Sequence, residues 1–193
     1  MNTTSTPDRE LPIIKGLLEW FREKDGLCQE KRVLDRVAAV VRRISLAADL
    51  HHGRVEFVVF DYEPISSYLF RLDHLGIVGI NSGCCNKFER DDEVAAFLSH
   101  QVARYVVQSR RSPPRDSSSV QERHRVCPVL WRRDEFLADA LSIEYLRKAG
   151  YNPKGVLRVL EEYRPQTRRQ KLDFSDRIWK VERRLGLTPK PVF

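Results

Sequence analysis

Apolar residues return every three or four positions through the N-terminal part of the chain, which is the spacing of an amphipathic helix. This pattern predicts one helix over residues 11–24 and a second over residues 30–50. The apolar stripe of the second helix consists of Val33, Val37, Val40, Val41, Ile44 and Ala47. Residues 1–9 are mostly polar and are predicted to be disordered.

The period then shortens to that of a strand. Residues 55–62 (VEFVVFDY) alternate and residues 75–80 (LGIVGI) form a second β-rich run, so with SYLFRL between them they predict a small sheet. A long helix is predicted to start at Asp91, where three consecutive acidic residues suit the positive end of the helix dipole. Its apolar stripe is Val94, Phe97, Leu98, Val102, Tyr105 and Val106.

Helix breakers and arginines fill residues 109–128, which are predicted to form a mobile basic loop. Further helices are predicted near residues 131–148, 153–164 and 174–185. Gly150 fits the end of the first of these, and Asn152 with Pro153 fits the start of the second. The whole pattern predicts an α+β fold, mostly helical with one small β-sheet, in a single domain over residues 10–193.

The chain has 34 Lys and Arg against 27 Asp and Glu, a formal net charge of +7. The excess is concentrated in the C-terminal half. No zinc-finger spacing, recognition-helix signature or aromatic-interleaved strand accompanies it, so nucleic-acid binding is not expected. The charge is typical of a solvated face, and it would also suit an acidic protein partner or an anionic membrane surface.

No apolar run reaches the roughly 20 residues needed to span a bilayer, so no transmembrane segment is expected. The N-terminus also lacks the cationic start and apolar centre of a secretory signal. The sequence leaves open whether it is a fragment of a longer, membrane-anchored precursor. The spacing of the four cysteines matches no disulfide framework, which predicts reduced thiols in an intracellular compartment.

Three segments carry the candidate chemistry: DDEVAAFLSHQVARYVV (91–107), RRDEFLADALSIEYLRKAGYNP (132–153) and FSDRIWKVE (174–182). Their order and spacing resemble the gluzincin metallopeptidases of the HtpX and CAAX prenyl-endopeptidase family, most closely its mitochondrial inner-membrane (Oma-type) branch. In that family an acid-led helix carries H-E-x-x-H. A later helix carries R-x-x-E-x-x-A-D followed by A-G-Y-x-P, and H-P-x-x-x-R-I comes downstream. The resemblance covers roughly residues 35–185 and implies a zincin-like fold. Because the most similar branch is mitochondrial, it leaves a cytoplasmic and a mitochondrial location as alternatives.

The intact family motif forms a zinc site. Two His at positions i and i+4 share one helix face and can bind one Zn²⁺, while the intervening Glu polarises the metal-bound water. A Glu from the second helix supplies the third protein ligand and leaves a fourth position for water and substrate. The resemblance therefore implies which positions of this chain correspond to the ligands and to the general base.

In this chain the first motif is changed at two of those positions. His100 matches the first ligand and Glu135 the third. Gln101 stands at the position of the general base, and an amide cannot accept the water proton. Arg104 stands at the position of the second His, where its guanidinium stays protonated and has no lone pair for a cation. No residue is therefore assigned a catalytic role, and neither zinc nor another cofactor is expected.

Other motif positions are partly retained. Asp139 matches the acid that supports the ligands, and Arg132 and Arg177 match motif arginines. Asp173 and Phe174 replace the family's His-Pro pair, one residue closer to Arg177 than in the family motif. His74, beside the second β-rich run, is a candidate to line a remnant cleft, with an ordinary loop residue as the alternative interpretation.

The leading interpretation is a metallopeptidase-like pseudoenzyme that acts by binding or regulating a protein or peptide, which an exposed strand edge could hold by backbone pairing. One alternative is a repurposed, metal-free enzyme in which His100, Glu135 or Asp139 acts as an acid or base. Another is a residual zinc metalloendopeptidase with unusual ligands. The leading interpretation predicts a contact at hydrogen-bond distance between Arg104 and Glu135, which would replace the metal as the tie between two helices.

Overall fold

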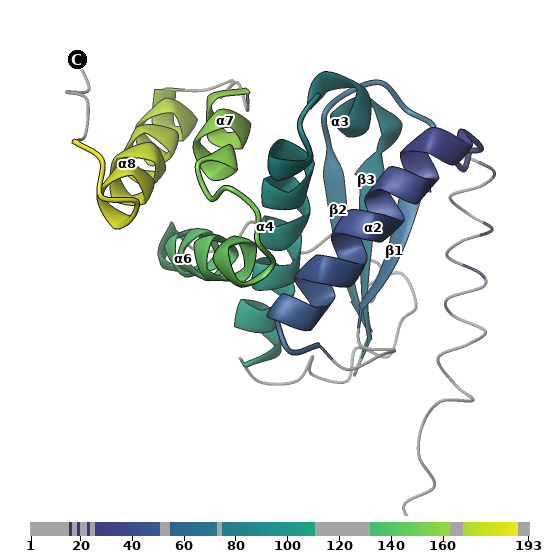
Figure 1. Ribbon diagram of the computed structural model, residues 1–193, viewed down its shortest axis with the longest axis horizontal. Helices are drawn as coiled ribbons and strands as arrows, with labels where there is room; N and C mark the ends of the chain where they lie inside the picture. Colours follow the sequence, from purple (N-terminus) through teal and green to yellow (C-terminus); the bar gives the residue numbers. More distant parts are fainter. Residues whose placement is uncertain are drawn as a thin grey trace, which may run out of the picture.

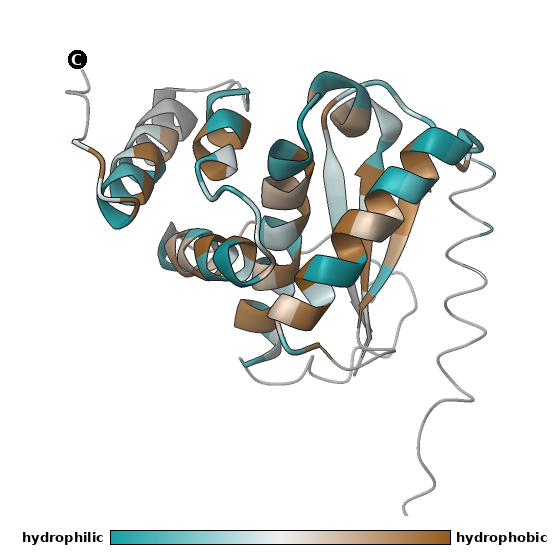
Figure 2. Cartoon of the chain, viewed as in Figure 1, coloured by the Kyte–Doolittle hydropathy of each residue, from teal (hydrophilic) through white to brown (hydrophobic). Residues whose placement is uncertain are grey.

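The computed structural model describes residues 16, 19, 23, 26–50, 55–72, 75–110, 132–162 and 168–188. Helix α2 (Lys31–Ala47) follows the predicted apolar stripe, because its buried residues are Val33, Val37, Val40 and Ile44. Hydrophilic and hydrophobic residues alternate around this helix, as Figure 2 shows. Such an amphipathic helix buries one face against a core and leaves the other in water.

The predicted small sheet is confirmed and has three strands, β1 (Val55–Phe60), β2 (Ser67–Leu72) and β3 (Leu75–Asn81). Strand β3 lies in the centre, parallel to β1 and antiparallel to β2. It is buried from Gly76 to Asn81, which explains why its sequence is continuously apolar where a half-exposed strand would alternate. Leu27 forms an isolated bridge to Phe60 at the outer edge of β1.

Helix α4 (Asp91–Ser109) begins at the predicted acidic turn and is the central helix of the fold. Residues on all its sides are buried, including Val94, Phe97, Leu98 and Val102. The short helix α3 (Ser82–Lys87) connects β3 to it. Arg36 of α2 fixes this corner, because its guanidinium contacts Asp91 Oδ1 at 2.7 Å and donates to the carbonyl oxygens of Cys85 and Phe88 at 2.8 Å.

The C-terminal part consists of α6 (Arg132–Lys148), α7 (Gly155–Glu162) and α8 (Arg168–Arg184). Gly150 ends α6 in the left-handed conformation, with φ of +73°, and the N–H of Tyr151 donates to the carbonyl of Leu146 at 2.9 Å. This is the Schellman geometry that favours glycine. The side chain of Asn152 accepts a hydrogen bond from the N–H of Lys154 at 3.0 Å, which is the capping role predicted for it.

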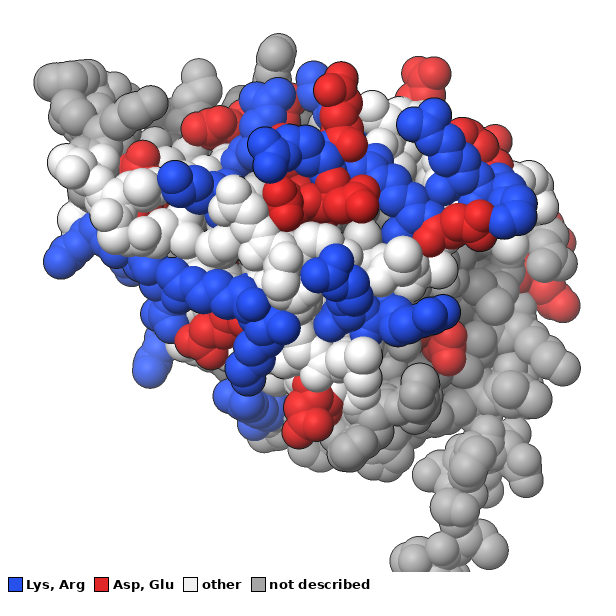
Figure 3. All heavy atoms as spheres, viewed as in Figure 1, with Lys and Arg blue, Asp and Glu red and all other residues white. Residues whose placement is uncertain are grey.

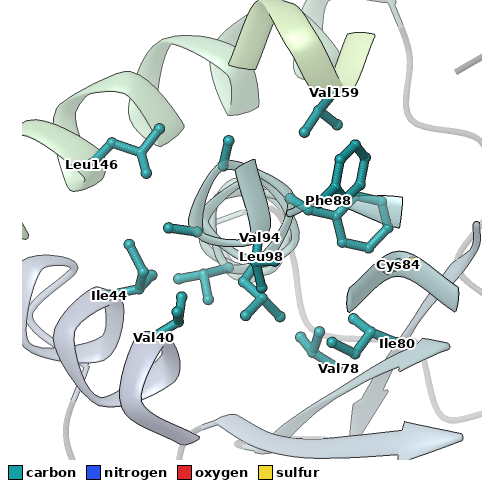
Figure 4. Packing of buried hydrophobic residues seen from close by; sticks show 14 of the residues in the cluster. Val40, Ile44, Val78, Ile80, Cys84, Phe88, Val94, Leu98, Leu146 and Val159 are labelled. Carbon is teal, nitrogen blue, oxygen red and sulfur yellow. The ribbon is translucent and has the colours of Figure 1, made fainter. Parts of the chain in front are cut away.

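The elements form layers around α4. In Figure 1, α2 and the sheet lie on one side of α4, while α6, α7 and α8 lie on the other, with α8 farthest from the sheet. Figure 4 shows α4 end-on, with side chains of α2, β3, α3, α6 and α7 directed toward it. One hydrophobic cluster connects all these elements, so the described residues form a mixed α/β structure that is mostly helical.

Several predicted boundaries need correction. Helix α3 was not predicted, because a six-residue helix is too short to display a period. Helix α8 begins at Arg168, before the predicted start at residue 174. The prediction missed this start because the first turn of the helix is polar and carries no apolar stripe. Helix α7 starts at Gly155 where residue 153 was predicted. Residues 1–9 and 111–128 lie outside the described part, and Ser109 and Arg110 end α4.

None of the described helices combines the length and the apolar character that a bilayer span requires.

The close approach of α7 to the start of α4 depends on Gly155. A Cβ at this position would lie 2.4 Å from the carbonyl oxygen of Asp92, a distance at which backbone must move. We therefore expect Gly155→Ala to lower the free energy of unfolding by about 1–3 kcal/mol. Urea denaturation of wild type and variant measures this loss. Gly16→Ala is the control, since nothing lies within 4 Å of its added Cβ. Equal stability of the two variants would contradict this packing.

Candidate functional site

Helices α4 and α6 approach each other closely because small residues face the contact. Ser99 and Ala103 of α4 and Ala138 and Ser142 of α6 are all fully buried. The two hydroxyl oxygens, Ser99 Oγ and Ser142 Oγ, lie 2.6 Å apart and share a hydrogen bond. This contact places His100, the residue after Ser99, against the face of α6 that carries Glu135 and Asp139.

His100 contacts two carboxylates of α6, those of Glu135 and Asp139. Its Nε2 lies 3.1 Å from Glu135 Oε2, and its Nδ1 lies 3.2 Å from Asp139 Oδ1. Glu135 and Asp139 are four residues apart and therefore share one helix face. A neutral imidazole can donate a hydrogen bond at only one nitrogen, so the contacts at both nitrogens indicate an imidazolium.

The protonation of His100 depends on competing effects. Burial lowers its pKa, but the hydrogen bonds and the charges of Asp139 and Glu135 outweigh burial and raise the pKa above 6.5. Arg177 Nη2 also lies 3.4 Å from His100 Nε2. We regard this as a contact between two donors, because Nε2 is closer to the Glu135 carboxylate and Arg177 has carboxylate acceptors of its own.

Arg177, on α8, also contacts the carboxylates of Glu135 and Asp139. Its Nε and Nη2 donate to the two oxygens of Asp139, each at 2.8 Å, in the bidentate geometry that suits a guanidinium and a carboxylate. Its Nη1 lies 3.3 Å from Glu135 Oε2. Arg177 thus connects α8 to both carboxylates that contact His100.

Arg104 lies one turn after His100 on α4 and makes weaker contacts. Its Nε lies 3.5 Å from Glu135 Oε1, which is an ion-pair distance but too long for a good hydrogen bond. Its Nη1 donates to Gln101 Oε1 at 3.2 Å. The buried Nε has no hydrogen-bond partner among the described residues. The predicted Arg104–Glu135 contact therefore exists as an ion pair, but the prediction of hydrogen-bond distance was wrong.

The cations hold both carboxylates in the ionised form. Burial alone would raise the pKa of Glu135, but the hydrogen bond from His100 and the charges of His100, Arg177 and Arg104 lower it to about 2. Burial has the same effect on Asp139, and hydrogen bonds from Arg177 and His100 lower its pKa to about 2 as well. Three side-chain cations thus surround two carboxylates, and we name these five residues the ionic cluster: His100, Arg104, Glu135, Asp139 and Arg177.

A cavity of about 140 Å³ borders the ionic cluster. All five cluster residues and Gln101 form its polar wall. Its apolar wall comes from α4, α7 and α8 and consists of Ala96, Phe97, Val156, Val159, Leu160 and Phe174. Sequence reasoning missed the contribution of α7, although the apolar period of the predicted 153–164 helix could have indicated a buried face.

The residues at the family's ligand positions do not fit a zinc ion. A ligating His must offer an unprotonated nitrogen, yet both ring nitrogens of His100 face carboxylate oxygens. Glu135 already contacts the guanidinium groups of Arg104 and Arg177. Within the described residues, no three His, Cys, Asp or Glu side chains are arranged to hold a metal ion.

The remaining predicted site residues contribute less. Gln101, at the position of the general base, is 4% exposed and uses its carbonyl oxygen to accept from Arg104. Arg132 starts α6, but its side chain lies outside the described part of the structure, as does all of His74. The structure therefore brings His100, Gln101, Arg104, Glu135, Asp139 and Arg177 together and leaves the other two predictions untested.

The described cysteines offer no activated nucleophile. Cys28, Cys84 and Cys85 are free and buried, as predicted for reduced thiols, and Cys127 lies outside the described residues. Burial raises the pKa of Cys84 to about 12 and that of Cys85 to about 11, which keeps both as unreactive thiols.

Basic side chains on the surface are interspersed with acidic ones. On the face in Figure 3, Lys and Arg are spread over the surface, with Asp and Glu among them. Arg184, for example, contacts Glu144 at 2.7 Å in an exposed ion pair. This distribution is typical of a solvated face, with a basic excess that would suit an acidic partner.

The ionic cluster predicts a large effect for one substitution. Glu135→Ala leaves His100, Arg104 and Arg177 with one carboxylate where two are present now, so we expect a loss of roughly 3–5 kcal/mol in the free energy of unfolding. Glu144→Ala, on the same helix, removes an exposed pair and should cost less than about 1 kcal/mol. Urea denaturation measures both, and similar losses would show that the cluster does not stabilise the fold.

The free energy of unfolding should also depend on pH. Because the folded pKa values of Glu135 and Asp139 are about 2, below the ordinary values of 4.5 and 3.8, their contribution is present above about pH 5 and is lost toward about pH 2. His100 adds the opposite dependence, since its raised pKa contributes stability below pH 6.5 that is lost as pH rises through the folded value. We expect the acid loss to be smaller in Asp139→Asn. Parallel pH profiles of unfolding free energy for wild type and variant would contradict this.

No protein-family model matches the chain, and no curated protein matches it either. The resemblance to the gluzincin metallopeptidases therefore stays a prediction from the quoted motifs. The function has to be inferred from the ionic cluster and from the cavity beside it.

Proposed function

We propose that the protein is a metal-free, non-proteolytic relative of the gluzincin zinc peptidases that acts by binding a protein or peptide. The observation that carries this proposal is the environment of Glu135. Its carboxylate stands at the family's third-ligand position, and it contacts His100, Arg104 and Arg177 at 3.1 to 3.5 Å. Protein cations thus occupy the positions around this carboxylate where a metal ion would have to bind.

A zincin-like fold is part of the proposal. It is supported by the arrangement of α4 between the sheet and α6 (Figure 1). His100 of the H-x-x-x-R turn contacts Glu135 and Asp139 of the E-x-x-A-D turn. The bidentate pair between Asp139 and Arg177 joins two positions that the resemblance matches to motif residues. A chance similarity of short motifs would not require their side chains to meet in one cluster.

Proteolysis needs a group that accepts a proton from water, and the cluster provides none. Gln101 is an amide, and both ring nitrogens of His100 face carboxylates. Glu135 and Asp139 are both held ionised by cations, with pKa values of about 2, which makes them weak bases near neutral pH. The same pairing disfavours a repurposed enzyme that would use these residues as acid–base groups.

Binding could use the edge of the sheet. Strand β2 pairs with β3 on one side and, among the described residues, with no strand on its other side. An extended peptide can add to such an edge through backbone hydrogen bonds without being cleaved. The basic residues interspersed over the surface would favour an acidic partner.

Metal content of the purified protein tests the proposal. We expect wild type to retain well under one equivalent of zinc after exposure to equimolar Zn²⁺ and desalting, and to cleave no unfolded-protein substrate. The double variant Gln101→Glu, Arg104→His supplies a carboxylate and a second imidazole at the family's positions, so it should gain up to about one equivalent of zinc.

Gln101→Glu alone serves as the matched control, because Arg104 remains and zinc should still be excluded. One tightly bound zinc per wild-type chain, or peptidase activity that a chelator abolishes, would refute the proposal. An unchanged zinc content in the double variant would show that Arg104 is not what excludes the metal.

A further inference from the structure

The cavity beside the ionic cluster contains a guanidinium whose hydrogen-bonding capacity is largely unused. A guanidinium has five N–H donors. Arg104 donates one hydrogen bond, to Gln101 Oε1, and its contact with Glu135 is long at 3.5 Å. Its other N–H groups have no protein acceptor among the described residues, in contrast with the bidentate pairing of Arg177. Arg104 is thus the cluster cation with donors to spare.

The charges of the cluster do not cancel. Arg104, Arg177 and an imidazolium at His100 oppose the two carboxylates of Glu135 and Asp139, which leaves one positive charge. A surplus cation in a partly buried site favours an anionic ligand carrying one negative charge. A dianionic phosphate would exceed that surplus, and it would also meet the carboxylates of the same cavity.

The opposite wall of the cavity is apolar. It is formed mainly by Val156, Val159 and Leu160 of α7 together with Phe174 of α8. The volume of about 140 Å³ is close to that of a cavity of roughly 150 Å³ known to hold benzene. Solvent reaches the site, since the side chains of His100, Arg104, Glu135 and Arg177 are 11 to 18% exposed.

We propose that this cavity binds one carboxylate group carried on a small apolar body, with the carboxylate on Arg104 and the apolar body against α7. The C-terminus of a peptide ending in an apolar residue and a free organic acid share this chemistry. The inference rests on the proposed function, because a zinc ion in the cluster would use the same space. It adds to that function the class of ligand that the pocket recognises.

Benzoate is the direct probe, with benzamide as its neutral isostere. Calorimetric titration of the full chain should show benzoate binding with millimolar or better affinity, and benzamide should bind at least about 10-fold more weakly. A peptide ending in free Leu, compared with the same peptide ending in a C-terminal amide, distinguishes the source. Preference for the free carboxylate peptide over benzoate identifies a peptide C-terminus, and binding of benzoate without the peptide identifies a small acid.

Two variants test the cationic wall and the apolar wall of the cavity separately. Arg104→Met removes the cation and should weaken benzoate binding roughly 10-fold or more. Val159→Phe fills the cavity from α7, leaves every charge in place and should abolish benzoate binding. Arg158→Met is the matched control, since Arg158 is an exposed neighbour on α7 that pairs with Glu162 at 2.9 Å and does not line the cavity. Circular dichroism confirms that each variant is folded.

Absence of benzoate binding to wild type would overturn the inference. Equal affinity for benzoate and benzamide, or unchanged benzoate affinity in folded Arg104→Met, would do the same. The zinc measurement separates this failure from failure of the proposed function. A zinc-free protein that ignores benzoate loses only the ligand assignment, whereas a zinc-loaded protein loses both.

Discussion

The bidentate pair between Arg177 and Asp139 is the interaction on which the C-terminal half of the structure depends. Helix α8 is highly charged, and Val181 is its only fully buried apolar residue among the side chains that the structure describes. Phe174 and Ile178 also pack against the core but are only partly buried. Ion pairs therefore supplement the attachment of α8 to α6: Arg177 reaches Asp139 at 2.8 Å and Glu135 at 3.3 Å in the interior, and Arg184 reaches Glu144 in an exposed pair. Because a buried carboxylate is costly without a cation, α6 in turn needs α8.

The same constraint gives a reason for the residues present in the first motif. Without cations from α4, Glu135 and Asp139 would lie in a buried site with only Arg177 opposite them. A guanidinium at Arg104 and an imidazolium at His100 supply the missing positive charge and one in surplus, without any lone pair for a metal. Arg104 is therefore better understood as a charge-balancing residue than as part of a basic surface. It is also the least satisfied member of the cluster, which makes it the natural contact for a ligand.

Much of this arrangement could be predicted from the sequence, for identifiable reasons. The start of α4 at Asp91 and the end of α6 at Gly150 follow from local chemistry, an acidic first turn and a left-handed glycine. The grouping of His100, Glu135 and Asp139 followed from motif order. The pairing of Arg104 with Glu135 was predicted, but the bidentate pairing of Arg177 with Asp139 was not. That second pairing depends on how far α8 extends and on side-chain reach across three helices, and neither leaves a period in the sequence.

The protonation state of His100 tests the account most directly, because the imidazolium distinguishes a cluster neutralised by side chains from a metal site. Its two ring nitrogens can be observed by ¹⁵N NMR at neutral pH, in the presence of a chelator and again with equimolar Zn²⁺. We predict that both nitrogens are protonated and that zinc leaves their chemical shifts unchanged. An unprotonated ring nitrogen whose shift moves on addition of zinc would contradict the account.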